Sequence, residues 1–135
     1  MKGDKREVCF LVGKGEAILW ADASDSPAAL PDSRARWEAI WKFRDEIEVI
    51  AHSHPMGPSA FSAEDNSTME ALDSALGKGG VRPNLRYMVV APRITIAREG
   101  TTTTEVVPEP WWAALLRLAS GLPREKEKEK EKEGV

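Results

Sequence analysis

Residues 51–65 read AHSHPMGPSAFSAED, a stretch in which two histidines are followed by an aspartate. His52 and His54 are the only histidines of the chain, and they close an apolar run, Ile47–Ala51, that predicts a buried strand. Because residues two apart on a strand point to the same face, we expect both imidazoles to project together. Their spacing therefore suits two ligands of one metal ion.

Asp65 is expected to come close to these histidines for a separate reason. The segment Ser62–Leu76 predicts a helix, because apolar residues recur at helical spacing from Met69 onward. Asp65 lies one turn before Met69, on the apolar side of this helix, where a charge is costly unless it is paired or binds a metal. Two histidines and one carboxylate, with a fourth position open, are the ligand set of a catalytic zinc site.

Each half of this pattern also has a simpler explanation. A His-x-His pair on a strand is often incidental, and Ser62 followed three residues later by Asp65 is a common N-terminal helix cap. Neither explanation accounts for the two halves occurring together with Pro55 between them. The combination favours a metal site.

The sequence HSHP at residues 52–55, with Ser62 and Asp65, resembles the signature of the JAMM (MPN-type) zinc metallopeptidases, also called JAB-domain proteins. That family uses a glutamate well upstream, in a stretch resembling Glu-Val-Cys-Gly-Leu-Leu-Gly. Residues 7–13 read EVCFLVG, which is similar, with phenylalanine where the family commonly has glycine. The resemblance extends from about residue 7 to about residue 107, and the chain looks like the compact prokaryotic branch.

The resemblance implies one zinc ion with a bound water. Its ligands in this chain would be His52, His54 and Asp65. Two more residues would act on the substrate: Glu7 would be the general base, and Ser62 would donate a hydrogen bond to the tetrahedral oxyanion.

Two of these assignments leave alternatives open, and two neighbouring residues are expected to be structural. The Ser62 hydroxyl suits both the helix cap and the oxyanion contact. Glu7 stands at the entrance of a strand, as many surface glutamates do, and Glu16 is the fallback base. Ser53 should point to the opposite face from the histidines and serve a structural role. Cys9 reads as a small buried apolar side chain.

The implied activity is hydrolysis of a peptide or isopeptide bond at the C-terminus of a ubiquitin-like or sulfur-carrier protein, as in a deubiquitinase. A non-catalytic MPN-type scaffold that binds partners is the alternative, although such relatives usually lack one or more ligands. A zinc nucleotide deaminase is a third class, but it needs a Pro-Cys-x-x-Cys pair, and the chain has one cysteine.

The pattern of elements predicts an α+β fold, with a mixed sheet flanked by helices, and the resemblance implies the cytidine-deaminase-like JAB/MPN fold. Ser33 is expected to cap a helix to about Arg44, with Trp37, Ile40 and Trp41 on its inner side. The family usually has a helix before the strand that bears the glutamate. Six residues precede Glu7 here, so that helix is expected to be missing or very short.

Length and composition predict one domain over residues 1–122 and a charged, mobile tail over residues 123–135. A single cysteine and the lack of a signal peptide or membrane span favour the cytoplasm. The net charge of −3 gives no reason to expect nucleic acid. The apolar helix that ends the domain, Trp111–Leu122, should pack on the core or on another chain, either a second copy or a partner.

Overall fold

The chain folds into strands and helices, with three consecutive strands before the last helix. A computed structural model describes residues 5–24, 33–57, 60–72, 74, 85–99 and 104–122. The elements in chain order are β1 (Val8–Gly13), a short 3-10 turn (Lys14–Glu16), β2 (Ile18–Ala23), α1 (Arg34–Lys42), β3 (Ile47–Ser53), α2 (Ala63–Leu72), β4 (Arg86–Val90), β5 (Thr95–Glu99), β6 (Glu105–Val107) and α3 (Trp111–Ser120).

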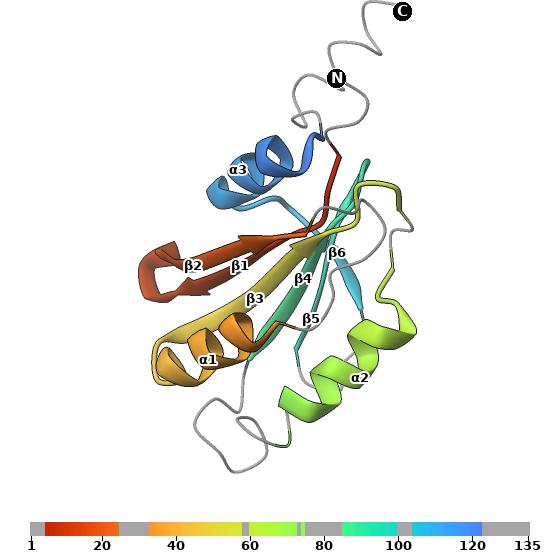
Figure 1. Cartoon of the computed structure of the whole chain (residues 1–135). Helices are drawn as coiled ribbons and strands as arrows, with labels where there is room; N and C mark the ends of the chain where they lie inside the picture. Colours follow the sequence, from red (N-terminus) through yellow and green to blue (C-terminus); the bar gives the residue numbers. More distant parts are fainter. Residues whose placement is uncertain are drawn as a thin grey trace, which may run out of the picture.

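The strands form one mixed sheet (Figure 1), with the order β2-β1-β3-β4-β5-β6. Neighbouring strands are antiparallel except β3 and β4, which are parallel and are joined through α2. A parallel connection must return to the starting edge of the sheet, so a helix in the crossover begins near the carboxyl end of the first strand. This topology brings the start of α2 close to the end of β3.

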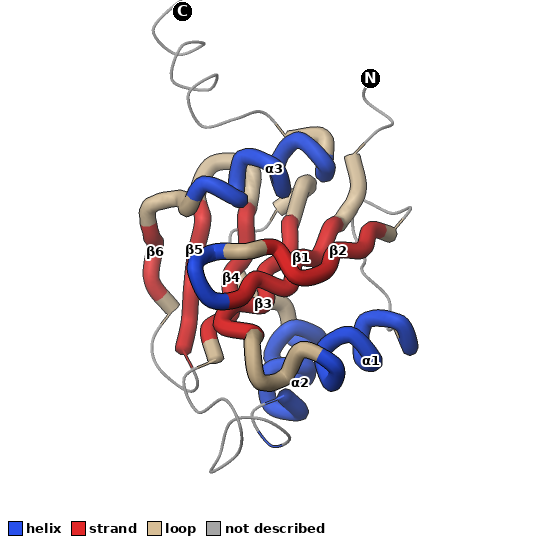
Figure 2. Tube along the Cα trace, turned by 90° about the vertical axis from the view of Figure 1, so that its left-hand side faces the viewer, coloured by secondary structure: helices blue, strands red, loops and turns tan. Residues whose placement is uncertain are grey.

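Helices cover both faces of the sheet, as Figure 2 shows. Side chains alternate along β1, so that Cys9 and Leu11 pack with α1 and α2, whereas Phe10 and Val12 pack with α3. Every residue of β1 is buried, because the strand lies inside the sheet between two helical layers. The anchor of the α3 layer is Trp112, which is 1% exposed and contacts the Phe10 ring edge to face.

The structure confirms the α+β fold with a mixed sheet flanked by helices, and it corrects one detail of α1. Ser33 caps this helix by accepting a hydrogen bond from the Arg36 amide. Of the predicted inner side, Ile40 is buried, but Trp37 and Trp41 are 36% and 59% exposed. The helix therefore presents Ala39 and Ile40 to the sheet, and the Trp41 ring stacks instead against the Arg44 guanidinium at 4.1 Å.

Two sequence predictions fall on parts of the chain that the structure does not describe. These are the extension of α2 to Leu76 and the charged tail over residues 123–135.

Among the described residues, none of the helices has the length and apolar character needed to cross a membrane. On α3, Trp111, Leu115 and Leu118 are exposed, so this helix buries one side and leaves the other open.

Candidate metal centre

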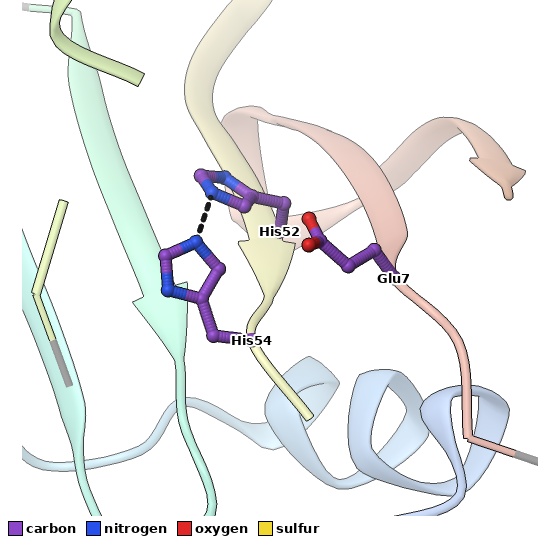
Figure 3. A group of neighbouring side chains, drawn as sticks. All are labelled: Glu7, His52 and His54. Atoms are coloured by element: carbon purple, nitrogen blue, oxygen red, sulfur yellow. Dashed lines mark hydrogen bonds between the residues drawn. The ribbon is translucent and has the colours of Figure 1, made fainter. Parts of the chain in front are cut away.

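The two histidines lie at the carboxyl end of β3. His52 is in the strand and pairs with Cys9 of β1, while His54 follows the strand, where its amide donates to the Val90 carbonyl at 3.0 Å. This bond keeps the chain aligned with β4 past the last residue of β3. The two Nε2 atoms lie 3.1 Å apart (Figure 3), so both imidazoles project to one point, as their spacing predicts.

Asp65 is held at the start of α2 by a reciprocal cap. The Ser62 amide donates to Asp65 Oδ2 at 2.7 Å, and the Asp65 amide donates to Ser62 Oγ at 3.0 Å. This arrangement satisfies two amide groups that a helix N-terminus otherwise leaves unpaired. The cap uses a lone pair of the Ser62 oxygen and not its proton, so the cap is chemically compatible with donation from the same hydroxyl.

The carboxylate of Asp65 faces both imidazoles. Its Oδ1 lies 3.0 Å from His52 Nε2, and its Oδ2 lies 3.2 Å from His54 Nε2. Burial, the largest single effect, raises the pKa of this carboxyl, but hydrogen bonds with both histidines, the charge of His52 and the Ser62 amide together outweigh it. The pKa of Asp65 is therefore held well below its usual range, and the group is a carboxylate at neutral pH.

Glu7 approaches the same point from β1. It is 7% exposed, immediately precedes the strand, and extends its carboxylate toward His52 (Figure 3). One ligand atom from each of Glu7, His52 and His54 lies within 4.8 Å of the others. The fallback, Glu16, is exposed in the turn at the opposite end of β1, so the structure does not bring it to this group.

A family model of prokaryotic homologues of the JAB domain matches residues 2–107 of the chain. The chain belongs to the JAB-domain family. The comparison with curated proteins gives no match. The matched range contains Glu7, both histidines and Asp65, and it ends before α3 begins.

The donor atoms of this JAB domain suit a zinc ion in kind and in spacing. Imidazole nitrogen and carboxylate oxygen are common zinc ligands, at about 2.0–2.2 Å from the metal. In a regular tetrahedron with such bonds, neighbouring ligand atoms lie about 3.3–3.6 Å apart, close to the spacing seen here. The contacts among His52, His54 and Asp65 range from 3.0 to 3.2 Å, so one small cation could contact all three.

Two neighbours of the histidines do not belong to this group. Ser53 points to the opposite face of the sheet and is fully buried there, as the alternation of strand residues predicts. Cys9 lies across from His52 but is 2% exposed, and burial raises the pKa of its thiol to about 12. A thiol with that pKa stays neutral and is a poor metal ligand, which agrees with its prediction as a buried apolar side chain.

The structure thus brings together the five residues that the sequence singled out, in one place at the end of β3. What sequence reasoning did not identify is how Glu7 is held there. The backbone around it is bonded to Ser53 and to the end of α3, more than a hundred residues away along the chain. The local sequence around a serine does not predict a hydrogen bond to a residue so far away along the chain.

Proposed function

We propose that this chain is a zinc-dependent peptidase or isopeptidase that hydrolyses a bond at the C-terminus of a ubiquitin-like or sulfur-carrier protein. The observation that supports the proposal most is the convergence of two imidazole nitrogens and one carboxylate within 3.2 Å, with a second carboxylate beside them. A structural zinc site is usually closed by four protein ligands. Three ligands and a nearby carboxylate correspond to a hydrolytic site.

In this proposal His52, His54 and Asp65 hold the ion. A zinc ion bound there would activate water near neutral pH and polarise the carbonyl of the scissile bond. Asp65 suits this task because it is ionised and because its cap with Ser62 fixes the direction of its carboxylate. A ligand fixed in this way needs little rearrangement when the ion binds.

Glu7 is proposed to accept the proton of the attacking water and to pass it to the departing amine. Its burial beside His52 supports this role, because proton transfer needs a carboxylate close to the attacking water. Ser62 is proposed to donate a hydrogen bond from its hydroxyl to the developing oxyanion, a contact typically worth about 3 kcal/mol in the transition state. The roles of these two residues are separable, because only Glu7 takes part in proton transfer.

The proposed substrate class rests on what the resemblance to JAMM metallopeptidases implies. JAB-type metallopeptidases act on the extended C-terminal tails of ubiquitin-like proteins, and the bacterial relatives process ubiquitin-like or sulfur-carrier proteins. An extended tail can be held by main-chain hydrogen bonds along a sheet. The proposal therefore assigns a folded protein with a flexible C-terminal tail as the substrate.

Cleavage of ubiquitin-like and sulfur-carrier fusions, with and without a chelator, tests the proposal. Wild-type protein should cleave at least one fusion, the chelator should abolish cleavage, and zinc should restore it. Glu7→Gln should keep one zinc per chain but lower the turnover rate by roughly 10²–10⁴-fold, because proton transfer is lost. The matched control is Glu16→Gln, the same change at the far end of β1, which should keep wild-type activity.

Two results would overturn the assignment in different ways. Well-folded protein that binds no zinc and cleaves no fusion would favour the non-catalytic scaffold. Wild-type turnover by Glu7→Gln would instead leave the metal site in place and remove Glu7 as the base.

A further inference from the structure

Glu7 lies outside the regular sheet, so its position depends on contacts of the residues beside it. The pairing of β1 with β3 ends at Cys9 and His52, two residues after Glu7. The Glu7 carbonyl accepts a hydrogen bond from the Ser24 amide at 2.9 Å, which ties it to the end of β2. The residues on either side of Glu7 are linked to the histidine-bearing strand by further hydrogen bonds.

Ser53 supplies that link from between the two histidines. The Val8 amide, one residue after Glu7, donates to Ser53 Oγ at 2.9 Å. On the other side of Glu7, the Arg6 carbonyl lies 3.5 Å from the same hydroxyl, which donates to it. Ser53 therefore contacts the chain on both sides of Glu7, and its neighbours His52 and His54 point to the opposite face.

The end of α3 holds Ser53 and Arg6 in turn. The buried Ser120 hydroxyl lies within hydrogen-bond distance of Ser53 Oγ, at 2.6 Å, and of the Leu116 carbonyl, at 2.7 Å, and these two acceptors share its single proton. The Arg6 amide donates to the Ser120 carbonyl at 3.1 Å, and Arg6 Nε donates to the Ala119 carbonyl at 3.0 Å. These are carbonyls of the last turn, which a helix leaves unpaired, and a cation is favourable there.

We propose that the Ser53–Ser120 pair positions Glu7 against His52 and His54, so that α3 helps to assemble the site from the opposite face of the sheet. This inference rests on the proposed function, in which Glu7 is the base. The residues that the family model matches end at residue 107, so Ser120 belongs to a segment outside that match. Ser53 and Ser120 are fully buried, and in this proposal they act through the backbone of residues 6–8.

A hydroxyl that only stabilises the fold would behave differently from one that positions Glu7. Loss of general stability lowers the fraction of folded protein and leaves the chemistry of the folded molecules unchanged. Loss of positioning lowers the turnover rate of folded, zinc-loaded protein, and it does so only while Glu7 is present. The distinguishing measurement is therefore a comparison of the same change with and without Glu7.

The experiment introduces Ser53→Ala into wild-type protein and into Glu7→Gln, and compares turnover per zinc-loaded chain. In the wild-type background, Ser53→Ala should lower kcat by roughly 10- to 100-fold, the usual range for groups that support an active residue, with little change in KM. In the Glu7→Gln background, it should lower kcat less than twofold further. Ser120→Ala should give the same pattern with a smaller loss.

A second readout does not depend on activity. Visible absorption of the cobalt-loaded protein reports the surroundings of the ion, to which the Glu7 carboxylate contributes. Ser53→Ala should shift this absorption in the same direction as Glu7→Gln. The control is Ser33→Ala, an equal change at the cap of α1, which should keep the wild-type spectrum and kcat per folded chain.

Two results would overturn the positioning role and leave Glu7 as the proposed base. One is an equal decrease of kcat in the wild-type and Glu7→Gln backgrounds, and the other is a wild-type kcat and spectrum for Ser53→Ala. If Ser53→Ala does not fold, Ser120→Ala decides by the same two criteria. Wild-type activity of Glu7→Gln is a different result, because it removes the proposed base itself.

Discussion

Two clusters of buried and half-buried ionisable groups lie on opposite faces of the sheet, and their chemistry differs. On the α3 face, Arg117 is 1% exposed and donates to both oxygens of Glu109, to Oε1 at 3.0 Å and to Oε2 at 3.1 Å. Thr95 donates to the same carboxylate at 2.6 Å, and Arg117 also donates to the Pro92 carbonyl at 3.3 Å. This cluster pairs a cation with an anion and joins α3 to the β4–β5 turn.

The cluster at the end of β3 contains no permanent cation. His52, His54 and Asp65 bring together two nitrogens and a carboxylate that all suit a positive ion. Arginine and glutamate neutralise each other's charge, whereas two imidazoles and a carboxylate together form a ligand set for a metal ion. The comparison teaches that burial of charge alone does not indicate a functional site; the deciding feature is whether the donors and acceptors already match.

The largest expected effect comes from removing one ligand of the β3 cluster. His54→Ala should lose stoichiometric zinc, and cleavage should fall by a factor on the order of 10³ or more, because the ion supplies the activated water. Circular dichroism should show a folded protein. Elemental analysis after dialysis measures the zinc, and one zinc per chain in this variant would show that the ion is held elsewhere.

The second prediction concerns the Arg117–Glu109 cluster, where a substitution should lower stability and leave zinc binding unchanged. Arg117→Met leaves Glu109 buried without its cation, and such a change typically costs about 3–5 kcal/mol of unfolding free energy. The folded fraction should still bind one zinc per chain. Denaturant unfolding measures the cost, with Arg34→Met as control, since that arginine forms an exposed pair with Glu38 and should have little effect. Loss of zinc in folded Arg117→Met would mean that the two clusters are coupled.

The smallest expected effect concerns Cys9, a buried thiol whose pKa is raised chiefly by burial. Burial raises the pKa of Cys9 to about 12, whereas a thiol in the unfolded chain titrates near about 8.5. Between these values the unfolded chain loses a proton that the folded chain keeps, so stability is fully present below about pH 8.5 and decreases as pH rises. At pH 9.5 the loss should be about 1.4 kcal/mol relative to pH 7.

Comparison with Cys9→Ala separates the loss of stability caused by the thiol from that caused by other groups that titrate at alkaline pH. The difference in unfolding free energy between the two proteins should shrink by the same amount from pH 7 to pH 9.5. An unchanged difference would show that the thiol is more accessible to water than its 2% exposure indicates.

The sequence predicted most of the sheet, because each strand is a short run of β-branched or apolar residues bounded by turns. It also predicted that His52, His54 and Asp65 converge, since strand alternation, helix periodicity and the family signature agree at these positions. Trp37 and Trp41 were placed on the wrong side, because their spacing fits a helix stripe as well as Ile40 does. The choice among these side chains depends on how α1 docks on the sheet, which is a tertiary property.

The groups that support the site were beyond sequence reasoning for a different reason. Ser53 and Ser120 are separated by 67 positions and join two elements that the chain connects only through the rest of the fold. Arg117 offered a weak signal, as a single charge within the apolar part of α3, but its partner Glu109 precedes the helix. Pairing of this kind is decided by packing and leaves no local pattern.

An anomalous difference map of zinc-loaded crystals tests the central claim most directly. We predict one peak, about 2.0–2.2 Å from His52 Nε2, His54 Nε2 and one carboxylate oxygen of Asp65. A peak bound by other residues, or no peak in crystals of protein that cleaves its substrate, would contradict the account.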